Sequence, residues 1–133
     1  MDFRLGLPLA NYLKENGRLG DCDLVSLAGG VKTLLSPEKE SDRDFLLGQI
    51  GKSLHLHEIQ EVILINHTDC GAYGGSSHFS SFTEERDFHI REMEKARNLV
   101  LSRFPSLKVN MVLAKIDPSS SVDFEEVSEL IPA

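Results

Sequence analysis

The stretch ILINHTDCGAYGG, residues 63–75, is the most informative part of this chain. Val62–Ile65 is apolar, as in a buried strand, and the polar residues and glycines that follow are typical of a turn. This strand would deliver the imidazole of His67 and the thiol of Cys70 to a glycine-rich turn. Both groups are good ligands for a borderline-soft ion such as Zn²⁺. For an isolated pair, the alternative is an inert, buried cysteine beside a hydrogen-bonded histidine.

Length and composition are those of an ordinary globular protein. We expect one domain over residues 1–133, because 41% of the residues are hydrophobic and 26% are charged. The net charge of −7 argues against a nucleic-acid or anionic-membrane partner, since both need a basic face. There is no membrane-spanning apolar run, and the two cysteines, Cys22 and Cys70, do not suggest a disulfide framework. We therefore expect a cytoplasmic protein.

The predicted elements alternate along the chain. We expect helices over residues 8–16, 42–56 and 84–103, and strands over residues 24–28, 62–65 and 109–116. The last helix should bury a stripe formed by Phe88, Met93, Ala96 and Val100. From Val122 to the apolar Leu130 and Ile131, a strand and a docking helix are equally consistent with the sequence. The alternation predicts an α/β fold, a single domain with a central, mostly parallel β-sheet flanked by helices.

Two further motifs should meet His67 at the carboxyl edge of the sheet, where ligands bind in such folds. Asp2 and Arg4 can form a bidentate ion pair if the backbone between them is extended. The pair would hold the carboxylate ionised, either to accept a proton from metal-bound water or to bind the metal; a solvated terminus is the alternative. The glycines of the segment 28–30 permit close approach to a small ligand, or form an ordinary turn.

The order of these motifs resembles the β-class carbonic anhydrases, in a short, divergent prokaryotic branch. That family carries Cys-x-Asp-x-Arg near the end of its first strand and His-x-x-Cys-Gly after a later one. The sequence MDFRL matches the first motif at Asp2 and Arg4. The sequence HTDCGAY matches the second at His67, Cys70 and Gly71.

The chain also departs from the family pattern. DLVSLAGG resembles the family strand that ends in Ala-Gly, but Ser26 and Leu27 replace the more usual Arg-Asn. The first cysteine ligand of the family would lie two residues before Asp2, ahead of Met1, together with most of the first strand. We expect a truncated or mis-started version of a complete enzyme; a real protein with a depleted site is the alternative. Cys22 precedes a strand and would enter at the opposite end of the sheet.

The resemblance implies zinc-dependent, reversible hydration of carbon dioxide to bicarbonate, in a homodimer. The implied catalytic residues are Asp2 and Arg4, the implied Zn²⁺ ligands are His67, Cys70 and Asp2, and the implied substrate-binding residues are Ala28, Gly29, Gly30 and Gly71. With Asp2 on the metal no free base remains, so we expect weak or absent activity from this chain. Two alternatives stay open: a carbon disulfide or carbonyl sulfide hydrolase, and a degenerate, inactive member that binds a metal or a partner.

The remaining polar groups near these motifs receive no role. Surface or helix-capping positions are expected for His55, His57, His78 and His89, although a histidine can shuttle protons. Asp69 is expected to be a solvated turn residue, with a hydrogen-bond acceptor behind the metal ligands as the alternative.

Overall fold

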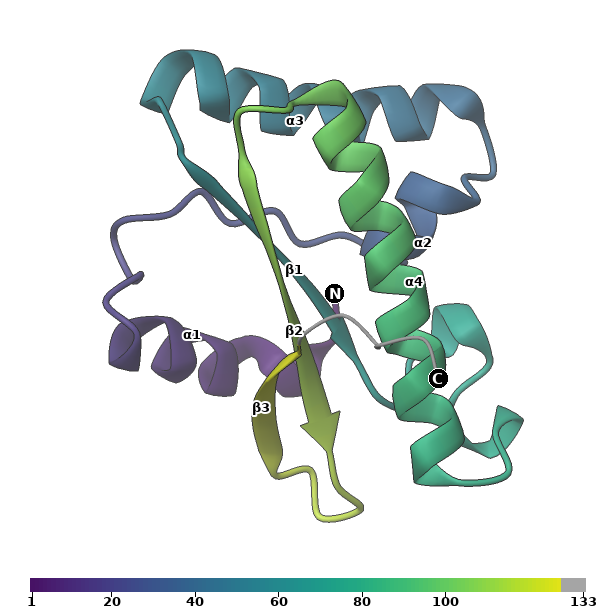
Figure 1. The fold of residues 1–133 in the computed structure, drawn as a ribbon. Coiled ribbons are helices and arrows are strands. Elements are labelled where there is room, and N and C mark those ends of the chain that lie inside the picture. Colours follow the sequence, from purple (N-terminus) through teal and green to yellow (C-terminus); the bar gives the residue numbers. More distant parts are fainter. Residues whose placement is uncertain (128–133) are drawn as a thin grey trace.

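The computed structural model describes residues 1–127 and contains a three-stranded sheet with helices on both faces (Figure 1). The strands are β1 (Glu61–His67), β2 (Lys108–Ile116) and β3 (Val122–Val127), in the order β1-β2-β3. β1 and β2 are parallel, whereas β2 and β3 are antiparallel. The α/β arrangement is confirmed, but the sheet is mixed rather than mostly parallel. The segment between β2 and β3 is too short for the crossover that a parallel pair needs.

Four α-helices lie among the described residues, and the three predicted ones are confirmed with small shifts of their ends. They are α1 (Gly6–Glu15), α2 (Gly30–Leu35), α3 (Glu40–His57) and α4 (Phe82–Arg103). Three short 3₁₀ turns complete the pattern: η1 (Phe3–Leu5), η2 (Gly71–Tyr73) and η3 (Ser76–His78). The sequence did not predict α2, because six residues are too few to show a helical period.

The main core lies between α4 and the sheet. Met93, Ala96 and Val100 of α4 are completely buried, as predicted, and pack with Leu113 of β2 in one apolar cluster. Phe88, the fourth predicted member of the stripe, is only partly buried. β1 and β2 are largely apolar on both faces, as a strand covered on both sides must be.

On the other face of the sheet, α1 packs against β3. The ring of Tyr12 in α1 stacks on Phe124 of β3, with 4.4 Å between ring centroids. The next residue of β3, Glu125, points the other way and accepts hydrogen bonds from Arg86 of α4. Neighbouring side chains of a strand alternate between faces, so α1 and α4 lie on opposite sides of β3 (Figure 1).

The strand predicted over residues 24–28 is wrong. Residues 24–27 have no regular structure, and Leu24 and Val25 are 61% and 49% exposed. A strand needs a hydrogen-bonded neighbour, and the described sheet pairs β1 only with β2. For the acidic segment that begins at Val122, the sequence is equally consistent with a strand and a helix, and β3 confirms the strand. Leu130 and Ile131 lie outside the described residues.

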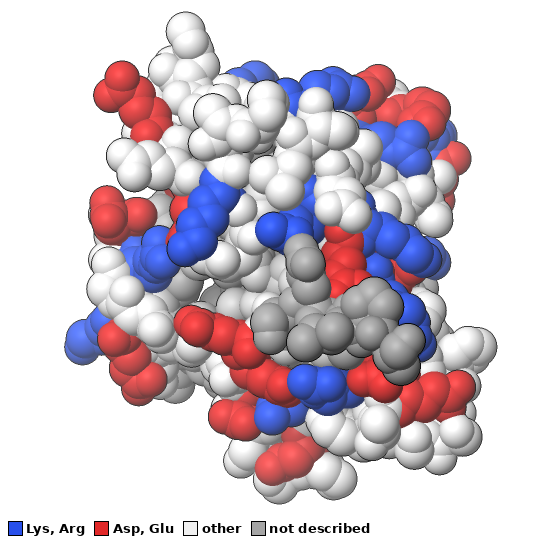
Figure 2. Space-filling model, in the orientation of Figure 1, with Lys and Arg blue, Asp and Glu red and all other residues white. Residues whose placement is uncertain are grey.

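Charged side chains of both signs are interspersed on the face shown in Figure 2. Several form ion pairs between elements, including Arg86 with Glu125 and Lys115 with Asp123. Within residues 1–127, no helix is both long and apolar enough to cross a membrane.

Candidate functional site

His67 is the last residue of β1 and has a buried imidazole, 7% exposed. Its Nδ1 lies 2.7 Å from the carbonyl oxygen of Thr68. A carbonyl only accepts, so Nδ1 carries the proton and Nε2 of the neutral ring has a free lone pair. Metal-binding histidines are usually held in this way, with the second ring nitrogen fixed by an acceptor.

Cys70 follows three residues later, at the N-terminal end of η2. Burial raises the pKa of its thiol, but the side-chain contact with His67 and a hydrogen bond from the backbone N–H of Ala72 outweigh burial, so the pKa lies below its usual value. For His67, burial lowers the pKa, but the contacts with Cys70 and Thr68 raise it by more. Together the two shifts favour a thiolate beside a protonated imidazole. The thiolate is the form that binds metal, whereas His67 would have to lose its second proton to do so.

Asp2 and Arg4 form the bidentate pair that their spacing predicts. The backbone at Asp2 is extended (φ −157°, ψ 132°) and begins η1. Arg4 donates from Nε to Oδ1 at 2.9 Å and from Nη2 to Oδ2 at 2.8 Å. These hydrogen bonds are the largest influence on the carboxyl group, and they lower the pKa of Asp2 to about 2.

The Asp2–Arg4 pair lies against the loop that carries Cys70. Asp2 Oδ2 is 4.0 Å from His67 Nε2. Arg4 donates from Nη1 to the carboxylate of Asp69 at 3.0 Å and from Nη2 to its carbonyl oxygen at 3.2 Å. Asp69 is therefore more than the solvated turn residue expected, and Arg4 joins the N-terminal segment to the loop.

The segment after residue 27 packs against the same loop. Gly29 has a left-handed backbone (φ +72°) and leads into α2; a Cβ there would lie 3.8 Å from that of Ala72. Lys32 Nζ donates to the carbonyl oxygen of Ala72 at 2.8 Å. Ala28 is exposed, and a Cβ at Gly71 would meet no atom within 4 Å. The three predicted motifs thus meet at one edge, while contact with a substrate stays a prediction.

The donors present fit Zn²⁺ in kind. His67 Nε2 and the thiol of Cys70 are the nitrogen and sulfur ligands that zinc prefers, and the nearby Asp2 is the candidate third ligand. Both oxygens of Asp2 are bound to Arg4, however. Among residues 1–127, no group of three or more His, Cys, Asp or Glu side chains is arranged to hold a metal ion. A complete zinc site would need a rearrangement that brings Asp2 into position, or a further donor.

Comparison with known proteins identifies the family. A family model described as "Putative carbonic anhydrase" matches residues 1–120. The chain belongs to this family. The match confirms the resemblance inferred from the motifs.

Two relatives of this family member come from Rickettsia, and both are uncharacterized. The protein from Rickettsia bellii is 30% identical over 120 residues, which are 88% of this chain and 73% of the relative. The protein from Rickettsia conorii is 28% identical over 120 residues, which are 88% of this chain and 64% of that relative. The chain therefore spans about two thirds to three quarters of these proteins. No solved structure matches.

In this family member, α4 contributes two buried residues that the sequence analysis missed. Glu85 is 3% exposed and accepts hydrogen bonds from the backbone N–H of Asp69 at 2.7 Å and from Ser76 Oγ at 2.9 Å. His89 is completely buried, so its expected surface position is wrong. Both residues lie on the helical stripe that continues through Met93. Extending that stripe backwards in four-residue steps from Met93 would have found them.

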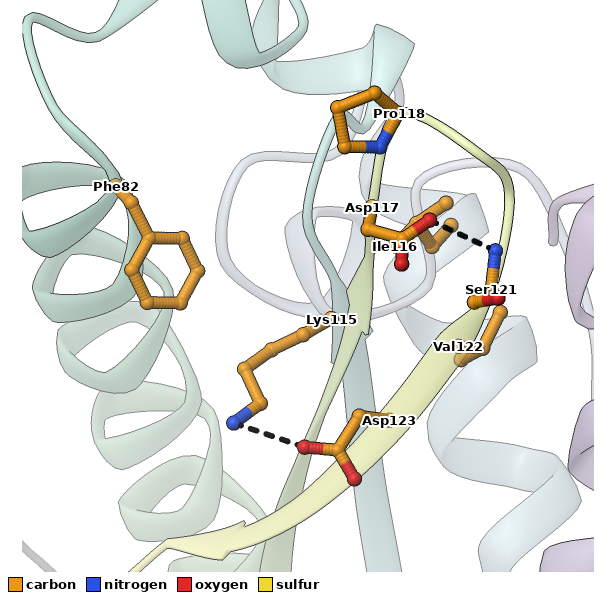
Figure 3. A pocket seen from close by; sticks show the side chains of 8 residues that line it. All are labelled: Phe82, Lys115, Ile116, Asp117, Pro118, Ser121, Val122 and Asp123. Carbon is orange, nitrogen blue, oxygen red and sulfur yellow. Dashed lines mark hydrogen bonds and ion pairs between the residues drawn. The ribbon is translucent and has the colours of Figure 1, made fainter.

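A separate hollow of about 360 Å³ lies between the start of α4 and the β2–β3 hairpin (Figure 3). Phe82 and residues on both sides of the hairpin turn line it. Lys115 Nζ lies 3.1 Å from Asp123 Oδ2 and 3.6 Å from Glu125 Oε2, so the charge of the lysine is compensated. None of the predicted site residues is among its described lining residues, so we do not place the substrate there.

Proposed function

We propose that this chain is a zinc-dependent lyase that hydrates carbon dioxide reversibly to bicarbonate, with His67 and Cys70 as metal ligands. The observation that carries the proposal is the position of these two donors beside the ionised Asp2–Arg4 pair, at the carboxyl end of β1. A bound Zn²⁺ would supply a Lewis acid that activates water for attack on carbon dioxide. Membership of a family described as "Putative carbonic anhydrase" supports this reaction class.

Asp2 would orient the attacking water. A pKa of about 2 keeps the carboxylate ionised at neutral pH, and an ionised carboxylate only accepts hydrogen bonds. A base with so low a pKa holds a proton poorly near pH 7, so the proton released by the water would pass to solvent rather than stay on Asp2. Arg4 would keep the carboxylate aimed by its two parallel hydrogen bonds.

Asp2 has a second possible role, as the third metal ligand. The two roles exclude one another, because a carboxylate that binds the metal is not free to accept a hydrogen bond from the attacking water. A zinc-loaded chain with Asp2 on the metal would therefore be a weak catalyst. Metal binding without turnover, with Asp2 as a ligand, is therefore the second candidate function. Hydrolysis of carbon disulfide or carbonyl sulfide on the same scaffold is a variant of the first.

We also propose that the protein forms a homodimer. Several apolar side chains next to Asp2 and Arg4 are exposed in the single chain: Met1 at 69%, Phe3 at 95% and Leu7 at 72%. Burial of such side chains against a second copy would stabilise the pair by removing apolar surface from water. Light scattering at micromolar concentration tests this proposal, and a monomer would contradict it.

The proposed reaction is tested by zinc analysis and stopped-flow kinetics on the purified protein. We expect about one Zn²⁺ per chain and hydration of carbon dioxide above the buffer rate. Zinc binding with no turnover of carbon dioxide, carbon disulfide or carbonyl sulfide would support the non-catalytic alternative. Failure to bind zinc would overturn the proposal.

A further inference from the structure

The carboxylate of Glu85 reaches from the first turns of α4 to the loop that carries Cys70. Its Oε1 accepts from the backbone N–H of Asp69 at 2.7 Å, and both oxygens accept from Ser76 Oγ, at 3.1 and 2.9 Å. Asp69 and Ser76 lie on either side of Cys70 in the sequence. One buried side chain therefore holds the loop at two points that flank the proposed metal ligand.

Burial removes the carboxyl group of Glu85 from water, and its hydrogen bonds to the loop must offset this loss of hydration. Glu85 is 3% exposed, and a carboxyl group is stable in such a place only when its oxygens accept hydrogen bonds. Among the described residues, the groups around it are an amide, a hydroxyl and an imidazole. The stability of α4 in this position thus depends on the loop, and the loop depends on Glu85.

His89, one turn further along α4, lies next to the same carboxylate. Asn66 Nδ2 lies 3.1 Å from His89 Nδ1, and because an amide nitrogen only donates, the proton of the neutral ring lies on Nε2. That Nε2 is buried without a hydrogen-bond partner and lies 3.8 Å from Glu85 Oε1. Asn66 directly precedes His67 in β1. His89 therefore contacts Asn66, just before the segment 67–70, and Glu85 contacts Ser76, after it.

The backbone of Asp69 shows that this loop is held from outside. Its φ is +54°, a left-handed conformation that is uncommon outside glycine, although aspartate adopts it more readily than most residues. Such a conformation persists when surrounding contacts determine it. At Asp69 the N–H is bound by Glu85, while the carboxylate is bound by Arg4 and by the N–H of Ser76.

We infer that Glu85 is a positioning residue for the loop that carries Cys70, which we call the metal loop (residues 68–76). By fixing Asp69 and Ser76, Glu85 keeps Cys70 facing His67 and the carboxylate of Asp69 facing Arg4. The inference rests on the proposed function, because it concerns the same two metal ligands. Glu85 itself touches neither the metal ligands nor the substrate in this arrangement, so its effect would pass through the loop.

The experiment compares Glu85 with its neighbour Glu84. Glu84 lies in the same turn of α4 and accepts from the backbone N–H of Ser80 at 2.7 Å, away from the metal loop. The variants E85A, E85Q, E84A and E84Q would be titrated with Co²⁺, and the intensity of the thiolate-to-cobalt absorption band would be recorded with the Kd. Hydrogen exchange of the Asp69 amide would be measured in the metal-free protein, so that one readout does not involve metal.

For E85A we expect a Kd for Co²⁺ raised at least about tenfold, a weaker thiolate band and faster exchange of the Asp69 amide. E85Q should recover part of each effect, because its amide oxygen can still accept from the N–H of Asp69. E84A and E84Q should lower the melting temperature but leave the cobalt band and the exchange rate unchanged. If E85A does not fold, the same measurements on E85Q and E84Q are compared instead.

The outcomes separate this inference from the proposed function. Wild-type values for the cobalt band, the Kd and the Asp69 exchange rate in E85A or E85Q would overturn the inference, as would equal losses in the Glu84 variants. If the wild-type protein binds no Co²⁺ or Zn²⁺, the proposed function fails. The exchange rate of the Asp69 amide then still decides whether Glu85 holds the loop.

Discussion

Arg4 and Asp2 are joined by two parallel hydrogen bonds, 2.9 Å from Nε to Oδ1 and 2.8 Å from Nη2 to Oδ2. The same guanidinium donates to the carboxylate of Asp69 at 3.0 Å. One planar group thus fixes a carboxylate next to His67 and also ties the N-terminal segment to the metal loop. A lysine could supply the charge but not this fork of donors. The site should therefore depend on the geometry of Arg4 as well as on its charge.

The first prediction concerns R4K. Loss of the bidentate contact should raise the pKa of Asp2 from about 2 towards its ordinary value of 3.8, because one ammonium group cannot replace both hydrogen bonds. Titration of the Asp2 carboxyl carbon by NMR measures the change. R18K is a matched control, since Arg18 forms its ion pair with Glu61 at the start of β1. An unchanged pKa of Asp2 in R4K would show that the two parallel hydrogen bonds from Arg4 do not lower this pKa.

The second prediction concerns the pH dependence of stability. The pKa of Asp2 is lower in the folded protein than in the unfolded chain, so its contribution is present above about pH 4 and is lost as the pH falls towards about 2. Wild type should exceed D2N in the free energy of unfolding by about 1 kcal/mol at pH 7, with the difference disappearing near pH 2. Urea unfolding followed by circular dichroism at each pH measures it. A difference that grows on acidification would show that the sign is wrong.

Much of the site could be predicted because its residues are adjacent in the sequence. Hydrophobic residues followed by a polar turn predict where β1 ends, and its end places His67 and Cys70. The spacing of Asp2 and Arg4 predicts their contact, since an extended backbone aligns the two side chains. These features depend on the local geometry of neighbouring residues, which can be inferred from a single sequence.

The wrong strand over residues 24–28 and the two missed buried residues of α4 depend on contacts between segments that are distant in the sequence. Leu24 and Val25 are apolar, but no sequence pattern states whether a neighbouring strand is present to pair with them. His89 is an ordinary histidine in the sequence; Asn66 and the rings of Tyr73 and Phe79 pack against it in the fold. The role of Glu85 likewise needs the loop to fold back onto α4.

The third prediction separates the two cysteines. C70S should lower the affinity for Zn²⁺ at least about a hundredfold, because a serine hydroxyl stays protonated and is a poor zinc ligand. C22S is the matched control: Cys22 is exposed in the segment between α1 and α2 and should leave zinc binding unchanged. Competition with a chromophoric chelator measures both affinities. Equal zinc affinity in C70S and wild type would exclude Cys70 as a ligand.

The fourth prediction tests the turn that leads into α2. Gly29 has a φ of +72°, and a Cβ there would lie 3.5 Å from Thr33 Oγ1 and 3.8 Å from the Cβ of Ala72. G29A should therefore destabilise the protein by about 1 kcal/mol, mainly through the unfavourable backbone. At Gly30, the first residue of α2, a Cβ would meet nothing within 4 Å, and alanine suits a helix. G30A should consequently be neutral or slightly stabilising in urea unfolding. Equal losses in both variants would mean that the left-handed backbone at Gly29 is not what the turn requires.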